Sequence, residues 1–227
     1  MNAHIATRPP NAPIRVLIVD DQAVMRNGLR ITLHPYADIE VVGEASSGPL
    51  AVTAAAQLRP DVVLMDLRMP AGDGVTATRQ IVAGGSGAAV LVFTTFDLDE
   101  DVYGAIDAGA SGYLLKDVEP DDLAAAVRAL VSGEDVVDAK VVRTVFAELR
   151  RRNRQASPTT VDASPLTSRE REILEGLAAG KTNKEIARDL VMEPGGVKSA
   201  ISRMLGKYDA KTRTQLITWA FQKGYLG

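Results

Sequence analysis

The chain has 227 residues, of which 46% are hydrophobic, and no cysteine, so a folded core is expected and disulfides and thiolate metal sites are excluded. No apolar run approaches the roughly 18–20 residues of a membrane-spanning helix, and we expect a cytoplasmic protein with no membrane partner. The net charge of −3 is unevenly distributed: residues 1–147 hold 20 acidic and 11 basic residues (−9), residues 148–164 hold 2 and 4 (+2), and residues 165–227 hold 7 and 11 (+4). This asymmetry favours two modules, the second near a polyanion, although ordinary surface variation would also explain it.

Residues 1–13 contain three prolines and no apolar signal-peptide core, so a disordered tail is predicted there. From residue 14 to residue 132, short β-rich apolar runs alternate with helix-like stretches. The predicted strands are 14–19, 39–42, 62–65, 89–93 and 113–115, and the predicted helices are about 23–33, 48–58, 74–83, 99–108 and 120–132. This alternation predicts an α/β domain with a parallel sheet that is covered on both faces.

A further helix is predicted over about 137–152, and a segment rich in Ser, Thr and Pro follows it at 155–165. That composition is typical of a flexible linker. We therefore expect one domain over 14–134, a helix and linker over 135–164, and a second domain over 165–227.

The second domain shows no strand pattern and reads as four short helices. Thr167 with Glu170, and Thr182 with Glu185, have the spacing of capping boxes that open the first two helices. Pro194 fits the first turn of a third helix, and residues 212–223 form a fourth. The tight turn at 191–193 between two short helices predicts a helix-turn-helix.

Five polar side chains stand at predicted strand ends of the first domain. Asp20 and Asp21 follow the first strand, Asp66 follows the third, and Thr94 and Lys116 follow the fourth and fifth. Carboxyl ends of parallel strands share one edge of a sheet, where ligands bind. Clustered carboxylates repel one another unless a cation intervenes, and oxygen ligands suit Mg²⁺.

Such a set suits phosphoryl transfer. A carboxylate can attack a phosphoryl group, an ammonium and Mg²⁺ can spread its charge, and a hydroxyl can sense the product. Each residue alone has an ordinary explanation: the adjacent aspartates as a helix cap, Asp66 as a turn residue, Thr94 as a strand residue and Lys116 as a solvated cation. Their shared edge favours the phosphoryl site.

Residues 14–132 resemble the receiver domain of two-component response regulators in the stretches VLIVDDQ at 16–22, VVLMDLRMP at 62–70, FTT at 93–95 and GASGYLLK at 109–116. The resemblance implies a (βα)5 flavodoxin-like fold with Asp66 as the phosphoacceptor. It implies that Mg²⁺ is held by Asp21, Asp66 and the backbone carbonyl of Arg68, with help from Asp20. Thr94 and Lys116 would contact the phosphoryl group. Tyr113 would swing inward on activation, or would be an ordinary half-buried strand aromatic.

Residues 166–198 resemble the four-helix DNA-binding domain of the LuxR type, in LTSRE at 166–170, GKTNKEIA at 180–187 and VK at 197–198. The two matches together point to the NarL/FixJ subfamily. They imply a transcription factor that a sensor histidine kinase phosphorylates, that dimerises on double-stranded promoter DNA and that catalyses only its own phosphoryl transfer and dephosphorylation. RNA polymerase is a further candidate partner.

The spacing of the third helix turns Val197, Ile201, Met204 and Leu205 inward and leaves Lys198, Ser199, Ser202 and Arg203 toward DNA. Resemblance places the first three of these polar residues at base edges. The candidate phosphate contacts are Lys184, Lys207, Lys211 and Arg213, with Thr182 and Asn183 at a helix amino end. A solvated basic face is the alternative. Gly196 and Ala200 depart from the family's usual Thr and His, which leaves the exact contacts open.

The fourth helix has an apolar face of Leu216, Ile217, Ala220 and Phe221, which would form a dimer surface or pack inside its own domain. Two other functions compete with the main hypothesis. A phosphatase of the haloacid-dehalogenase type also uses a strand-end aspartate, but it requires an acid where this chain has Arg68. The helical domain could alternatively bind protein instead of DNA.

Overall fold

The computed structural model describes residues 12–70, 74–94, 100–133, 136–137 and 166–226. The chain divides into two compact units, Met1–Val136 and Val137–Gly227. Most of the predicted tail and of the predicted helix over 137–152, together with the linker after it, lies outside the described residues. Within the described ranges, no helix has both the length and the apolar character needed to cross a membrane.

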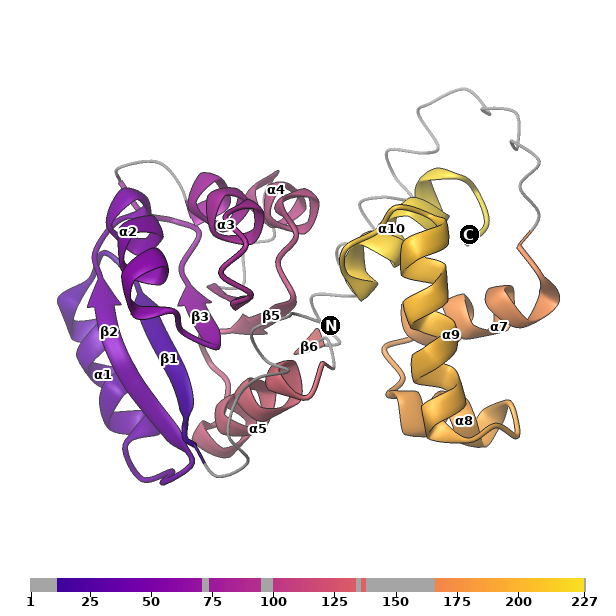
Figure 1. Cartoon of the computed structure of the whole chain (residues 1–227), viewed down its shortest axis with the longest axis horizontal. Coiled ribbons are helices and arrows are strands. Elements are labelled where there is room, and N and C mark those ends of the chain that lie inside the picture. Colours follow the sequence, from indigo (N-terminus) through magenta and orange to yellow (C-terminus); the bar gives the residue numbers. More distant parts are fainter. Residues whose placement is uncertain (1–11, 71–73, 95–99, 134–135, 138–165, 227) are drawn as a thin grey trace. The chain divides into compact units, whose positions relative to one another are not determined.

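The first unit contains a parallel sheet of five main strands, which confirms the predicted fold class (Figure 1). The strand order is β2-β1-β3-β4-β5-β6. The strands are β1 (Ile14–Val19), β2 (Ile39–Ala45), β3 (Val62–Met65), β4 (Ala89–Thr94), β5 (Gly112–Leu115) and β6 (Val136–Val137). The two-residue β6 beside β5 was not predicted, and the predicted helix over 137–152 does not include Val137.

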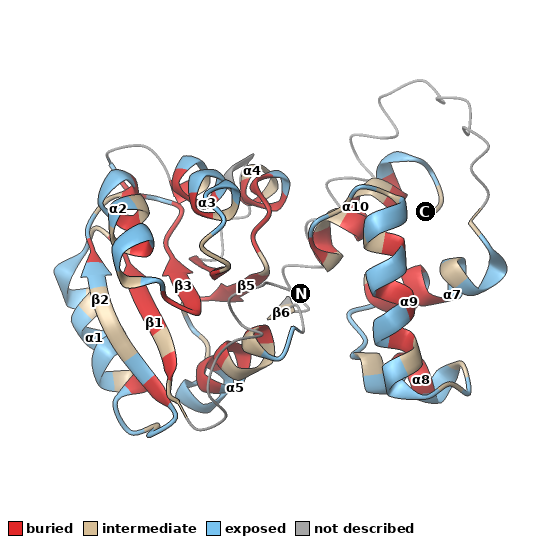
Figure 2. Cartoon of the chain, viewed as in Figure 1, coloured by how far each residue is buried: buried red, intermediate tan, exposed pale blue. Residues whose placement is uncertain are grey.

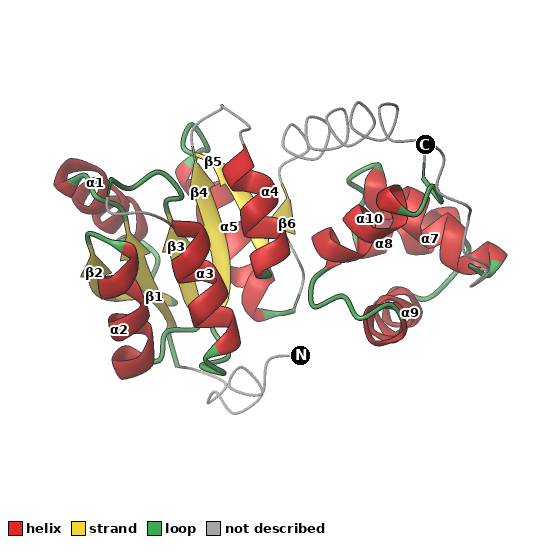
Figure 3. Cartoon of the chain, turned by 90° about the horizontal axis from the view of Figure 1, so that it is seen from above, coloured by secondary structure: helices red, strands yellow, loops and turns green. Residues whose placement is uncertain are grey.

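Helices cover both faces of this sheet (Figure 3). Helices α1 (Ala23–Leu33) and α5 (Pro120–Val131) lie on one face. Helices α2 (Gly48–Leu58), α3 (Gly74–Ala83) and α4 (Glu100–Ala108) lie side by side on the other. Every residue of β3, β4 and β5 is buried (Figure 2), as expected for strands with helices on both sides.

The edge strand β2 is longer than its apolar run. The predicted strand ended at residue 42, but β2 continues to Ala45, whose carbonyl accepts a hydrogen bond from the Asp20 N–H at 3.2 Å. Its burial is mixed, and Glu40 and Glu44 are exposed. Because an edge strand can keep polar residues, an apolar run underestimates its length.

The second unit consists of α7 (Ser168–Ala178), α8 (Asn183–Asp189), α9 (Pro194–Lys207) and α10 (Arg213–Gln222). Both predicted capping boxes form. The Thr167 side chain accepts a hydrogen bond from the Glu170 N–H, and the Glu170 carboxylate accepts one from the Thr167 N–H; Thr182 and Glu185 do the same. These boxes satisfy amide groups that a helix start leaves without partners.

The core of this unit corrects part of the predicted pattern of α9. Val197, Ile201 and Met204 are buried as predicted, but Leu205 is only half-buried and Ala200 is buried. The apolar face of α10 is also buried: Leu216 is fully buried and Phe221 is 3% exposed. Since α10 packs against α7 and α9, this face packs inside its own unit and is not an exposed dimer surface.

Candidate functional site

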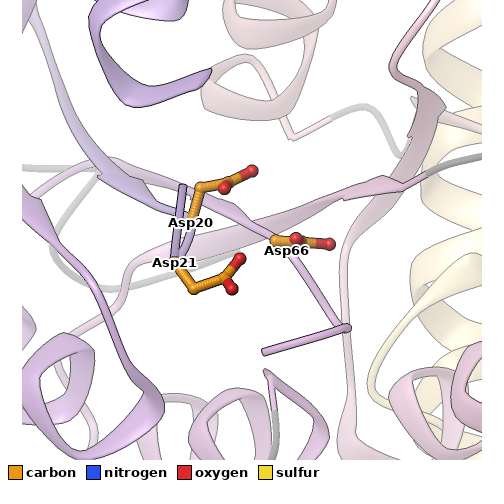
Figure 4. A group of neighbouring side chains, drawn as sticks. All are labelled: Asp20, Asp21 and Asp66. Atoms are coloured by element: carbon orange, nitrogen blue, oxygen red, sulfur yellow. The ribbon is translucent and has the colours of Figure 1, made fainter. Parts of the chain in front are cut away.

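Three carboxylates meet at the carboxyl edge of the first unit's sheet (Figure 4). In the pairing of β1 with β3, Val19 lies opposite Met65, so Asp20 and Asp66 leave their strands at the same level. The Asp66 N–H donates to the Val19 carbonyl at 2.9 Å. One carboxylate oxygen each from Asp20, Asp21 and Asp66 lies within 4.8 Å of the others.

A lysine joins two of these acids. The Lys116 ammonium donates to Asp20 Oδ2 at 2.7 Å and to Asp66 Oδ2 at 3.0 Å, and Asp20 and Asp66 are almost completely buried. The Lys116 N–H donates to the Thr94 carbonyl at 2.8 Å, which ties the ends of β5 and β4 together. The structure therefore brings Thr94 and Lys116 to the edge that carries the acids.

Burial and the ion pairs shift the pKa values of Asp66 and Lys116 in opposite directions. Burial raises the pKa of Asp66, and the hydrogen bonds from Lys116 and from the Arg68 N–H, at 3.3 Å, only partly counter it. Burial would lower the pKa of Lys116, but its hydrogen bonds to Asp20 and Asp66 outweigh that effect, so its pKa is raised. Lys116 therefore remains a cation at neutral pH.

The donor set fits a divalent cation that prefers oxygen ligands. Asp21 Oδ1 is buried and has no hydrogen-bond partner among the described residues. A buried carboxylate oxygen without a partner is costly, and a bound cation would satisfy it. Clustered carboxylates with a nearby main-chain carbonyl match the ligands that Mg²⁺ accepts. Arg68 approaches the site through its N–H, which donates to Asp66 Oδ1, and its carbonyl as a ligand stays a prediction.

Tyr113 lies in β5 next to this edge and is fully buried. It is therefore not the half-buried aromatic of the simpler alternative. Its side chain already points inward in this structure, so a movement of Tyr113 on activation stays a prediction.

Sequence reasoning missed two residues of the site. A Cβ on Gly74, the first residue of α3, would lie 2.1 Å from the Asp66 carbonyl oxygen and 2.7 Å from Leu67 Cα. Arg26, in α1, donates to the main-chain carbonyls of Asp20 and Asp21. The sequence offered one signal for each: Gly74 is an unexplained glycine at a predicted helix start, and Arg26 is a cation five residues after the acid pair.

In the second unit, α9 presents one exposed face (Figure 2). Lys198, Ser199, Ser202 and Arg203 are all exposed there, opposite the buried Val197. The Ser199 hydroxyl donates to the Gly195 carbonyl at 2.9 Å, within the same helix. The residues predicted to face DNA therefore share a solvent-accessible surface.

The candidate phosphate contacts divide into two groups. Lys184 and Lys211 are exposed. Lys207 instead pairs with Glu170 at 3.0 Å, and the Arg213 guanidinium donates to the Lys181 carbonyl, so these two cations link parts of their own unit. Sequence spacing could not show this, because the partners lie 37 and 32 residues away.

The amino end of α8 is mostly committed to its own capping. The exposed Thr182 hydroxyl serves the capping box, and Asn183 is half-buried. At the amino end of α9, Glu193 makes no side-chain capping hydrogen bond. The helix nevertheless begins at Pro194 and includes Gly196.

Comparisons with known proteins match both units. Residues 16–128 match the family described as "Response regulator receiver domain", and residues 164–220 match "Bacterial regulatory proteins, luxR family". The chain is 44% identical to transcriptional regulatory protein LiaR of Bacillus subtilis, over 91% of this chain and 96% of that protein. It is 41% identical to response regulator protein VraR of Staphylococcus aureus, over 94% and 99% of the two chains. The crystal structure of response regulator ChrA of a heme-sensing two-component system has a TM-score of 0.53 at 36% identity, over 95% of this chain and 100% of that one.

Proposed function

The chain belongs to the response regulators that join a receiver domain to a LuxR-type DNA-binding domain, and from this membership we propose that phosphorylation of Asp66 controls its binding to DNA. The observation that carries the proposal is the contact of one lysine with two buried carboxylates, beside a third whose oxygen has no partner. A partner histidine kinase or a small phosphodonor would supply the phosphoryl group. The family match favours this function over the phosphatase alternative.

The proposed reaction is an in-line displacement at phosphorus. An Asp66 carboxylate oxygen forms the new O–P bond while the bond from phosphorus to the donor's leaving atom breaks, and the leaving group keeps the electron pair. Asp20, Asp21, Asp66 and the Arg68 carbonyl would hold Mg²⁺, which when bound supplies positive charge for the phosphoryl oxygens. The Lys116 ammonium, which donates to Asp66 Oδ2 in this structure, would supply a second positive charge. The Thr94 hydroxyl would donate a hydrogen bond to the phosphoryl group on Asp66.

The proposed output follows from the second unit. Movement of Thr94 and Tyr113 would shift an existing equilibrium toward a dimer that binds a two-fold operator. The exposed face of α9 would lie toward DNA, with Lys198, Ser199 and Ser202 at base edges and Arg203 beside them. Lys184 and Lys211 would meet phosphates. The protein would act in the cytoplasm, with RNA polymerase as a further candidate partner. It would catalyse only its own phosphorylation and dephosphorylation.

Incubation of the full chain with Mg²⁺ and acetyl phosphate tests the first half of this proposal. Intact mass should show one added phosphoryl group in the wild type and in the control Asp122→Ala, which removes an exposed acid of α5, but not in Asp66→Ala. An adduct on Asp66→Ala would overturn the assignment of the phosphoacceptor.

Binding to a pool of random-sequence DNA duplexes tests the second half. The phosphorylated chain should bind more tightly than the unphosphorylated chain, and the affinity should fall as salt rises. An adduct without salt-sensitive binding would favour the alternative in which the helical unit binds a protein.

A further inference from the structure

The Arg26 side chain contacts the main-chain carbonyls of Asp20 and Asp21 and not their carboxylates. Arg26 Nη1 donates to the carbonyl oxygen of Asp20 at 2.8 Å and to that of Asp21 at 3.2 Å. Arg26 Nε donates to Glu44 Oε2 at 3.2 Å, near the end of β2. The Arg26 side chain is only 17% exposed, and it lies between the backbone of Asp20 and Asp21 and the edge strand β2.

The two carbonyls belong to the two peptide groups that flank the Cα of Asp21. Each peptide group is planar, so a fixed carbonyl oxygen restrains the plane of its peptide. Two restrained planes that meet at one Cα leave φ and ψ of Asp21 little freedom, and the direction of its Cα–Cβ bond follows. The Gln22 N–H, which donates to Asp20 Oδ1 at 2.8 Å, restrains the second plane from another side.

Asp21 depends on this restraint more than the other two acids do. Asp20 and Asp66 are each held directly by the Lys116 ammonium. Asp21 Oδ1 is buried without a hydrogen-bond partner among the described residues, so the position of Cβ, which the backbone sets, is the restraint on this oxygen that the structure shows.

We propose that Arg26 is a positioning residue that clamps the two peptide planes around Asp21 and so aims the Asp21 carboxylate at the metal. This inference rests on the proposed function, in which Asp21 is a ligand of Mg²⁺. The direction in which Mg²⁺ affinity changes when Arg26 is removed separates positioning from a simple charge effect. A nearby guanidinium repels Mg²⁺, so charge alone predicts tighter binding when Arg26 is removed, whereas positioning predicts weaker binding.

Calorimetric titration of the full chain with Mg²⁺ distinguishes the two effects without measuring phosphorylation. Arg26→Gln should weaken Mg²⁺ affinity by about 10-fold, the loss typical of residues that orient metal ligands. Arg30→Gln is the matched control, because Arg30 lies one turn later on α1 and also approaches Glu44, with Nε 3.6 Å from Oε1. It removes the same charge but none of the contacts with the two carbonyls, and its affinity should stay at the wild-type value.

Thermal unfolding without Mg²⁺ checks that the variants fold, and Arg26→Met, which keeps the apolar stem, serves as the second variant. Affinity equal to or tighter than wild type in both Arg26 variants would overturn the positioning role, and so would loss of folding in both. A wild-type chain that binds no Mg²⁺ would instead overturn the proposed metal site itself.

Discussion

The acid cluster of the first unit and the helix caps of the second unit are held in opposite ways. In the first unit, Lys116 reaches Asp20 and Asp66 across 96 and 50 residues of sequence, and the three side chains are largely buried. In the second unit, Thr182 and Glu185 are three residues apart and exposed. The first arrangement depends on the sheet topology, and the second depends on a single turn of chain.

This difference sets how each unit should respond to a substitution. Removing one member of a buried ion pair leaves an uncompensated charge in a poorly solvated place, whereas an exposed group that loses its partner can turn to water. Large single effects are therefore expected at the acid site, and small ones at the helix caps.

The largest effect is expected for Lys116→Met, which leaves Asp20 and Asp66 buried without their cation. Loss of one partner of a buried ion pair costs about 3–5 kcal/mol, and we expect about 3 kcal/mol here because some solvent reaches the site. Denaturant unfolding followed by far-ultraviolet circular dichroism in metal-free buffer measures it. Lys184→Met, at an exposed lysine, is the control, and equal stability of the two variants would contradict a buried cluster.

Thr182→Ala removes one half of the capping box of α8 and should lower the stability of the second unit by about 1 kcal/mol. The single tryptophan, Trp219, lies in this unit and stacks on Tyr208 with ring centroids 4.0 Å apart, so its fluorescence follows the unfolding of this unit. Thr53→Ala in α2 removes a hydroxyl that donates to the Pro49 carbonyl, and it should leave the tryptophan transition in place. A shift as large as that of Thr182→Ala would show that the two units unfold together.

A smaller gain is expected for Gly196→Ala in α9. A Cβ there would meet only Met192 Cε at 3.7 Å, and alanine is favoured over glycine in helices by about 0.5–1 kcal/mol. Gly206→Ala, at the other end of α9 with open space around the Cβ, should stabilise similarly. Gly180→Ala should destabilise instead, because Gly180 has a φ of 76°. Destabilisation by Gly196→Ala would reveal a steric need for glycine in the folded unit.

The smallest effect concerns pH. Burial would raise the pKa of Glu170, but hydrogen bonds from the Thr167 N–H and from Lys207 outweigh it and lower the pKa below its ordinary 4.5. The folded unit therefore binds fewer protons than the unfolded chain, so its stability should fall as pH drops from about 4.5 through the folded pKa. The tryptophan transition measured from pH 6 to pH 3 should show this fall, and Glu170→Gln should make it shallower, with Glu185 and Asp189, whose pKa values are also lowered, supplying the rest. An unchanged slope in Glu170→Gln would assign the pH dependence to other carboxylates.

The same contrast explains what could be predicted from sequence. The buried strands of the first unit read directly as apolar runs, and strand ends in a parallel sheet must share an edge, so the meeting of Asp66 with Lys116 was predictable. The capping boxes were predictable because they are local. The pairing of Lys207 with Glu170 and the half-buried Leu205 were not, because they depend on how helices pack.

The residues that support the site were not identified from sequence, although each left a weak signal. Nothing in the local pattern shows that Arg26 reaches back to two carbonyls. The length of β2 was missed because its edge position, which permits the exposed Glu44, follows from the order of the strands and not from the strand's own residues.

The missing side chain of Gly74 has a mechanical consequence. The start of α3 rests directly on the backbone of Asp66 and Leu67, so even a methyl group would collide with it. The helix start has little room to advance toward that backbone, because the Gly74 N–H also donates to the Leu67 carbonyl at 3.4 Å. A displacement that begins at Asp66 and moves toward the helix would therefore also move the start of α3.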